Sequence, residues 1–344
     1  MNDPTTDPRD HDRHGAFLRR AATLIAALLT LALLAAGLFA GGNASAHRPS
    51  HSEKPHPLEK KYVVQDELTL KADLAGKLPY TPKVIILGGS RSLRFEPAYI
   101  QKKTGLKGFN AGIRNGRPEE AWGITHFLHG LWPEARPRYL WLVHVKLLRG
   151  WWRVEPPLVQ DKRFSRYFPQ SFIDEQAPLM PESTGKVPVM SKLPPPKWAP
   201  DGHIVWSHSD TLRLATGVRV TINQWFKKNG PGAATIERRP KRWFGKTLDY
   251  MNNELDATPV LVMMPVQPDV LKRIGPGGFW DAHQQVMDYL DSLRGTYRFK
   301  LIDLTDIASF GGDPQNFYDG YHPKAENTRR IIDEILRRFP HAFD

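Results

Sequence analysis

The stretch VIILGGSRS, residues 84–92, is the sharpest change from apolar to polar character in this sequence of 344 residues. Its four apolar residues, mostly β-branched, are typical of a strand that is covered on both faces, as in a parallel sheet. Gly88 and Gly89 then allow a tight backbone turn. Ser90 is therefore expected at the carboxyl end of the strand, the edge where open α/β sheets bind ligands. A hydroxyl at this place is a candidate nucleophile, although small residues followed by serine are also an ordinary turn.

Strands and helices alternate from Lys83 onward. Four more short apolar runs predict buried strands at Leu106–Asn110, Tyr139–Val143, Pro259–Pro265 and Phe299–Leu304. Helical patterns follow the strands at Pro97–Lys103, from Pro118, at Trp243–Leu255, at Asp281–Arg294 and from Lys324. Helices between successive strands imply a parallel sheet with helices on both faces. We therefore predict an α/β domain with a doubly wound, five-stranded parallel sheet.

Residues 151–235 interrupt this alternation, and 10 of the 30 prolines fall between residues 151 and 200. Aromatic residues such as Phe164, Phe168 and Trp198 are too frequent here for a disordered linker. We expect a proline- and aromatic-rich insertion that packs over the sheet. It acts either as a lid over the site or as a structural cover without substrate contact.

The amino-terminal part has the pattern of an export signal. Residues 1–20, expected to be a cytoplasmic tail, end in Arg19-Arg20, and residues 21–40 form an uncharged run rich in Leu and Ala. This run can just span a bilayer as a signal anchor, whereas Ala44-Ser45-Ala46 offers cleavage after Ala46. In both cases the arginines keep the amino end inside and export the rest. Residues 41–80 are expected to be a stalk or linker, and residues 81–344 the folded domain.

The composition narrows the chemistry. No cysteine occurs, which excludes disulfides, thiolate nucleophiles and cysteine-ligated metal sites. The net charge of +12 suits anionic surroundings such as phosphate-bearing or uronate polymers or lipid headgroups, although a solvated basic face is the ordinary explanation. No nucleic-acid-binding module is recognisable, so nucleic acid is not an expected partner.

The loop before the last helix contains FYDGYHP, residues 317–323. A serine hydroxyl needs a neighbouring base to become nucleophilic, and the base needs an acceptor on its other ring nitrogen. His322 and Asp319 provide both groups from one turn. The loop follows the fifth strand, so His322 is expected at the same carboxyl edge as Ser90. Asp-Gly and His-Pro are also common turn residues, and the pair alone does not decide between the two interpretations.

Together, these two ends of the chain resemble the SGNH, or GDSL-like, hydrolase family, from about Lys83 to Phe339 with an interruption at residues 151–235. Gly88-Gly89-Ser90 is similar to the family's first block, and Asp319-x-x-His322 is similar to its last block. The resemblance implies a flavodoxin-like sheet. It also implies that Ser90 is the nucleophile, His322 the base and Asp319 the acid that orients the base.

The resemblance further implies an oxyanion hole made by the backbone amides of Ser90 and of a glycine in the second block. We choose Gly116, with Gly112 as the competitor, because the loop is one residue longer than expected. The family also places an asparagine donor after the third strand, but this sequence has His144 there. In other enzymes, the loss of one oxyanion donor lowers kcat by about 10²- to 10³-fold. Asn115 or His144 is the expected substitute.

Other residues near Ser90 leave alternatives open. Gly89 stands where the family's first block usually has an aspartate, which some members tolerate. Ser92 is a rival nucleophile, with helix capping as the ordinary explanation for a serine at this position. Ser92 also stands where the G-x-S-x-G elbow of α/β-hydrolases has its last glycine, so the sequence does not match that motif. Four arginines are expected to flank the same edge, where they either bind an anionic substrate or form a solvated rim: Arg91, Arg94, Arg114 and Arg117.

These features predict an exported, membrane-tethered serine esterase or O-acyltransferase that acts through an acyl intermediate on Ser90. The expected substrates are acylated small molecules, or acylated glycans or lipids of the cell envelope, and residues 21–40 are the expected contact with the membrane. No metal or organic cofactor is implied. The alternative is a catalytically silent envelope-binding module on the same fold, which the missing third-block asparagine favours.

Overall fold

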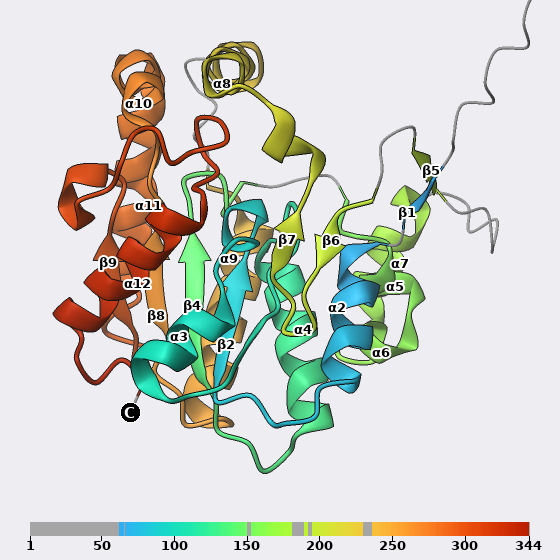
Figure 1. The fold of residues 1–344 in the computed structure, drawn as a ribbon. Coiled ribbons are helices and arrows are strands. Elements are labelled where there is room, and N and C mark those ends of the chain that lie inside the picture. Colours follow the sequence, from blue (N-terminus) through green and yellow to red (C-terminus); the bar gives the residue numbers. More distant parts are fainter. Residues whose placement is uncertain are drawn as a thin grey trace, which may run out of the picture. The chain divides into compact units, whose positions relative to one another are not determined.

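A sheet of five parallel strands lies at the centre of the computed structural model (Figure 1). In spatial order the strands are β3 (Gly108–Asn110), β2 (Val84–Gly88), β4 (Arg138–Val143), β8 (Val260–Met263) and β9 (Lys300–Asp303). Each neighbouring pair is parallel; Ile85, for example, lies opposite Phe109 on one side and Tyr139 on the other. The predicted doubly wound, five-stranded α/β sheet is thus confirmed.

The structure describes residues 62–64, 66–149, 153–180, 189–191, 195–229 and 236–343. All of them belong to one compact unit, Glu59–Asp344. The predicted tail, apolar segment and cleavage site lie outside the described residues. Within the described ranges, no helix is long and apolar enough to cross a membrane.

The strand order creates one crevice at the carboxyl edge of the sheet. The chain passes from β2 outward to β3 and then returns to β4 on the other side of β2. The loops that leave β2 and β4 therefore run to opposite sides, and ligands bind at such a reversal in open α/β sheets. Ser90 follows β2 and His144 follows β4, so both residues lie at this crevice.

Helices cover both faces of the sheet. One face carries α3 (Pro97–Thr104) and α12 (Ala325–Arg338), which lie in front of the strands in Figure 1. The other face carries α2 (Glu67–Gly76), α4 (Pro118–Leu131), α9 (Arg238–Asn253) and α11 (Trp280–Ser292). Successive strand side chains point to opposite faces, so Ile86 packs toward α12 and Leu87 toward α4. Each such buried side chain stabilises the fold by roughly 1.5–3 kcal/mol.

The insertion at residues 151–235 holds short regular elements, and several of its aromatic residues are buried in the core. Its first part contains α5 (Pro157–Gln160), α6 (Lys162–Ser165) and α7 (Gln170–Gln176), and it buries Phe164, Phe168 and Phe172 in the same cluster as α4 and α9. Its second part contains α8 (Leu214–Asn229), which packs beside α10 (Pro268–Ile274).

Two small antiparallel sheets pair β1 (Tyr62–Val64) with β5 (Val189–Ser191) and β6 (Lys197–Trp198) with β7 (Ile204–Trp206). Single turns occur at Ala177–Leu179, His208–Thr211, Gly275–Phe279 and Ile307–Phe310.

The folded domain begins earlier than the sequence indicated. Residues 67–76, assigned to the stalk at 41–80, form α2 and contribute Leu68, Ala72 and Ala75 to the core. These residues recur at helical spacing, but two of them are alanines, so the apolar stripe is too weak to recognise before its partners are known. The boundary predicted at residue 81 is therefore wrong by at least fourteen residues.

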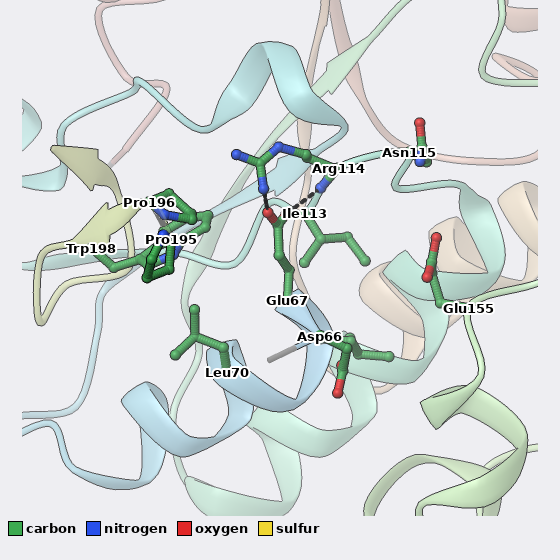
Figure 2. Close-up of a pocket in the computed structure, with 11 residues that line it drawn as sticks. Asp66, Glu67, Leu70, Ile113, Arg114, Asn115, Glu155, Pro195, Pro196 and Trp198 are labelled. Carbon is green, nitrogen blue, oxygen red and sulfur yellow. Dashed lines mark hydrogen bonds and ion pairs between the residues drawn. The ribbon is translucent and has the colours of Figure 1, made fainter. Parts of the chain in front are cut away.

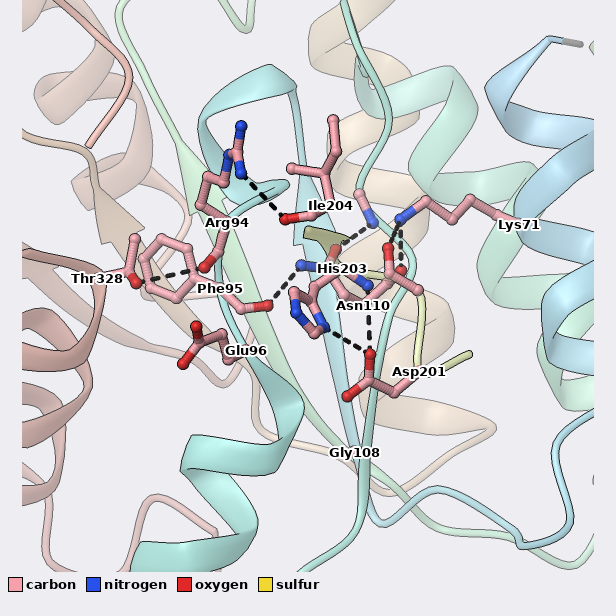
Figure 3. Close-up of polar contacts among 12 residues, drawn as sticks. Lys71, Arg94, Phe95, Glu96, Gly108, Asn110, Asp201, His203, Ile204 and Thr328 are labelled. Carbon is pink, nitrogen blue, oxygen red and sulfur yellow. Dashed lines mark hydrogen bonds and ion pairs between the residues drawn. The ribbon is translucent and has the colours of Figure 1, made fainter. Parts of the chain in front are cut away.

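Lys71 of α2 is fully buried and attaches the insertion to the sheet (Figure 3). Its Nζ donates one hydrogen bond to the carbonyl oxygen of Asn110, at 2.7 Å, and another to the carbonyl oxygen of Gly202. The ammonium group also lies 4.5 Å from the centre of the Trp198 ring. Burial lowers the pKa of Lys71 well below its ordinary value, an effect that the negative charge of Asp201 partly offsets. These contacts fix the turn before β7 against the end of β3.

We expect Lys71→Met to destabilise the protein by about 2–4 kcal/mol, because two buried carbonyl groups lose their donor. Urea unfolding followed by circular dichroism measures the change. Lys77→Met, at the exposed end of the same helix, is the matched control and should change stability by less than about 0.5 kcal/mol. Equal stabilities of the two variants would show that the buried lysine does not anchor the insertion.

Candidate active site

Ser90 lies in the first turn after β2. The short 3-10 turn Ser90–Ser92 begins directly after Gly89, so the Ser90 hydroxyl emerges at the carboxyl edge of the sheet. Its Oγ lies 2.8 Å from Nε2 of His322, although the two residues are 232 positions apart in the sequence. The structure thus brings the first and last predicted site residues into hydrogen-bond contact.

His322 is held in turn by Asp319. Nδ1 of His322 lies 2.8 Å from Oδ2 and 3.0 Å from Oδ1 of Asp319, and Oδ1 also accepts the backbone N–H groups of Tyr321 and His322. Burial by itself raises the pKa of the Asp319 carboxyl, but the charge and hydrogen bond of His322 and the two backbone donors outweigh it, so the pKa is below its ordinary value. The ionised carboxylate places the ring proton on Nδ1, which leaves Nε2 to accept the Ser90 proton.

Helix α8 of the insertion supports the loop that carries Asp319. Thr221 Oγ1 accepts the backbone N–H of Gly320 at 3.1 Å. Gly217 packs so closely that a β-carbon there would lie 2.6 Å from the carbonyl oxygen of Tyr318 and 2.7 Å from Cβ of Asp319. The insertion therefore contacts the site through its second half, as a support for the loop.

A cavity of about 570 Å³ opens beside Ser90. It is lined by residues from the loops after β2, β3 and β4, from α8 and from the closing loop: Gly89, Ser90, Arg91, Asn115, Gly116, Arg117, His144, Lys146, Leu147, Arg149, Gln224, Tyr321 and His322. Four of these side chains are cationic, and none of the described residues that line the cavity is acidic. The cavity therefore has a positive potential that favours anionic groups.

The four arginines predicted to flank Ser90 separate into two groups. Arg91 and Arg117 line the cavity. Arg94 instead pairs with Asp210 and donates to the carbonyl oxygen of Val205 at 3.1 Å. Arg114 pairs with Glu67 and lines a second cavity of about 420 Å³, on the side of Trp198 (Figure 2). The expectation that all four flank the same edge is corrected, because the acidic partners of Arg94 and Arg114 lie in segments that the sequence analysis did not connect to them.

Ser92 and Gly112 lie apart from the cavity. Ser92 is fully buried, and its Oγ donates a hydrogen bond to the carbonyl oxygen of Gly89 at 2.7 Å. Gly112 packs directly against the Ser92 side chain. Gly116 lines the cavity, but its N–H already donates to the carbonyl oxygen of Ile113 at 3.1 Å. Asn115, whose backbone has a positive φ of 55°, lines both cavities.

His144 occupies the position after β4 where the resemblance leads us to expect an asparagine. Its Nδ1 accepts the backbone N–H of Lys146 at 3.1 Å, so the proton of the neutral ring is on Nε2. Burial, together with the positive charges of Arg91 and Lys146, lowers the pKa of His144 well below its ordinary value. A β-carbon at Gly89 would lie 3.5 Å from Nε2 and 3.8 Å from the Gly116 nitrogen. The Nε2–H group is therefore a neutral donor close to the turn that presents Ser90.

Sequence reasoning missed five residues of the cavity lining: Lys146, Leu147, Arg149, Gln224 and Tyr321. Lys146 and Arg149 lie in the loop after β4, so they could have been expected at the same edge as His144. Tyr321 lies between the two residues that were predicted in the closing loop. Gln224 comes from α8, and no pattern in the insertion marks it.

The arrangement has the three parts that nucleophilic catalysis at serine requires: a hydroxyl, a base within hydrogen-bond distance of it, and an ionised group that orients the base. In the described part of the chain, no group of three or more His, Asp or Glu side chains is arranged to hold a metal ion.

Comparison with known proteins gives little further guidance. No family model matches the chain, and no curated protein matches it. A crystal structure described as that of a putative acylhydrolase from Bacteroides fragilis NCTC 9343 aligns with 80% of this chain and 97% of its own, at 11% sequence identity and a TM-score of 0.37. This likeness is too distant to carry an argument about function.

The contact between α8 and the closing loop predicts that Gly217→Ala slows the reaction of Ser90 with a fluorophosphonate probe. The added methyl group must displace the backbone beside Asp319, and small misplacements of a catalytic group lower rates by about 10²-fold. Labelling rates measured by intact-protein mass spectrometry test this. Thr216→Ala, at the exposed neighbouring position, is the control. If both variants react at the wild-type rate, α8 does not position the loop.

Proposed function

We propose that this protein is a serine esterase or O-acyltransferase with Ser90 as its nucleophile. The observation that supports the proposal most directly is the unbroken hydrogen-bond chain from Ser90 through His322 to Asp319 at the carboxyl edge of a parallel sheet. The resemblance of the two terminal motifs to SGNH hydrolases agrees with this assignment. A serine hydroxyl in an ordinary turn needs neither a histidine at 2.8 Å nor a carboxylate behind that histidine.

The reaction proceeds in two halves. Ser90 Oγ attacks the ester carbonyl carbon while its proton passes to Nε2 of His322. The attack forms a C–O bond to Ser90 and turns the carbonyl oxygen into the oxyanion of a tetrahedral intermediate. The anion collapses, the bond to the alcohol breaks, and the alcohol leaves with the proton from Nε2, so that the acyl group remains on Ser90. Water or a second hydroxyl then attacks the acyl group by the same steps in reverse.

His144 is the proposed replacement for the missing asparagine donor. Its Nε2–H is oriented by the hydrogen bond at Nδ1 and is neutral, so it can stabilise an oxyanion without taking part in proton transfer. Gly89 supports this role, because an aspartate side chain at that position would extend into the space in front of Nε2. The backbone N–H of Ser90 is the second proposed donor. Asn115 is the third, in preference to Gly116, whose N–H already donates to the carbonyl oxygen of Ile113.

The site is proposed to work outside the cytoplasm, next to a membrane. Arg19-Arg20 followed by the apolar run at 21–40 supports an exported domain that is tethered by this segment or released by cleavage after Ala46. The acylated substrate is then a glycan, a lipid or a small molecule of the cell envelope, and the acyl acceptor is water or a sugar hydroxyl. No cofactor takes part in the proposed steps.

A catalytically silent envelope-binding module is the second candidate. The missing asparagine and the cationic cavity favour it, because a binding module needs only the cavity. Against it, the hydrogen bonds that hold His322 have no use in a site that only binds.

We expect Ser90→Ala and His322→Ala each to lower kcat/KM for an aryl acetate by about 10³-fold or more, with little further loss in the double variant, because the residues act as a unit. Asp319→Asn should lower kcat/KM by a smaller factor, since an amide still contacts the His322 ring. Ser92→Ala removes only a hydrogen bond to the Gly89 carbonyl and should keep turnover. If turnover survives Ser90→Ala but not Ser92→Ala, the nucleophile is Ser92 and not Ser90. A wild-type protein without turnover or probe labelling would favour the silent module.

For His144 we expect the alanine variant to lose about 10²-fold in kcat with little change in KM, because the lost hydrogen bond forms only in the transition state. His144→Asn should recover part of the loss, since an amide can donate from a similar place. Steady-state kinetics with the same aryl acetate measure both variants. A larger loss in Asn115→Ala than in His144→Ala would assign the donor to Asn115 and contradict the role of His144.

A further inference from the structure

Arg91 is a buried cation that has no hydrogen-bond partner among the described residues. Only 6% of its surface is exposed, and no described residue accepts a hydrogen bond from its guanidinium or forms an ion pair with it. Its guanidinium lies over the face of the Tyr321 ring, 4.4 Å from the ring centre. Burial lowers the pKa of Arg91 to about 10, an effect that the neighbouring Tyr321 and Asp319 partly offset, so the group is still charged at neutral pH. A buried charge is costly unless an opposite charge and acceptors accompany it.

Asp319 does not fill this role. It is the acid of the triad, and its oxygens already accept the Nδ1–H of His322 and the backbone N–H groups of Tyr321 and His322. The guanidinium carries five N–H donors, and none of them has an acceptor among the described residues. The missing acceptors are therefore expected on a ligand.

Tyr321 adds a second donor at the same place. Its hydroxyl is buried and has no hydrogen-bond partner among the described residues, and burial raises the pKa of Tyr321 to about 12. The hydroxyl is thus protonated and can donate. Lys146 places another positive charge 5.3 Å from the centre of the same ring. Arg91, Tyr321 and Lys146 all line the cavity that contains Ser90 and His322.

We propose that this cavity selects esters that carry an anionic group, a carboxylate or a phosphate, bound by Arg91 and Tyr321 beside the reacting carbonyl. This inference rests on the proposed function and adds the substrate class to it. A planar guanidinium fork matches the two oxygens of a carboxylate or phosphate, and the hydroxyl can donate to a third acceptor. The anionic group resides either on the acyl chain or on the alcohol, and its position distinguishes two substrate sources.

Matched ester pairs test the inference. On the acyl side, 4-nitrophenyl butyrate is compared with 4-nitrophenyl hemisuccinate; on the alcohol side, an acetylated glycerol is compared with the same ester of glycerol phosphate. We expect kcat/KM to favour the anionic member of at least one pair by about 10- to 100-fold, and Arg91→Gln to abolish that preference while changing the neutral ester much less. Arg91→Lys, which keeps the charge without the fork, should retain an intermediate preference. Arg273→Gln, at an exposed arginine of α10 outside the cavity lining, is the control.

A binding measurement separates this inference from the proposed function. Inorganic phosphate titrated calorimetrically into the Ser90→Ala variant should bind, and binding should be lost when Arg91→Gln is added. If wild type turns over neither ester of any pair but phosphate still binds through Arg91, the anion site stands and the esterase proposal fails. If wild type turns over neutral and anionic esters equally and phosphate does not bind, the anion site is refuted and the esterase proposal stands.

Discussion

The hydrogen bond between Ser90 and His322 joins the loop after β2 to the loop after β9, with β4 and β8 between these two strands in the sheet. The closing loop therefore has to cross back over the carboxyl edge, and long crossing loops need support. Thr221 of α8 and the backbone N–H of Gln267, which donates to the carbonyl oxygen of Gly320 at 3.0 Å, provide it from two different elements. The insertion is thus part of what lets a serine early in the chain meet a histidine near its end.

Charged groups of both signs lie around this hydrogen bond. Asp319 is ionised and faces His322, while four cationic side chains line the cavity beside Ser90. The same cations help to keep His144 neutral, so one ring at this edge serves as a donor while the other is left to accept a proton. A positive cavity also favours the negative charge that develops in a tetrahedral intermediate.

The sheet was predictable because it depends on local patterns. Short runs such as Val84–Leu87 and Tyr139–Val143 are apolar along their whole length, as expected of strands that are buried on both faces. The pairing of Ser90 with Asp319 and His322 followed from the rule that loops after parallel strands share one edge. Contacts between distant segments were not predictable. The partners of Arg94 and Arg114, the core role of α2 and the contact of Gln224 with the cavity all depend on packing that no short stretch of sequence encodes.

The central claim is that Ser90 is the activated nucleophile. Peptide mapping by mass spectrometry after treatment of the whole protein with a fluorophosphonate tests it most directly, since the probe forms a stable bond only with a serine whose proton a nearby base removes. We expect one adduct per chain, on Ser90, that is absent from the His322→Ala variant. An adduct on Ser92, or an unmodified Ser90 in folded protein after prolonged exposure, would contradict it.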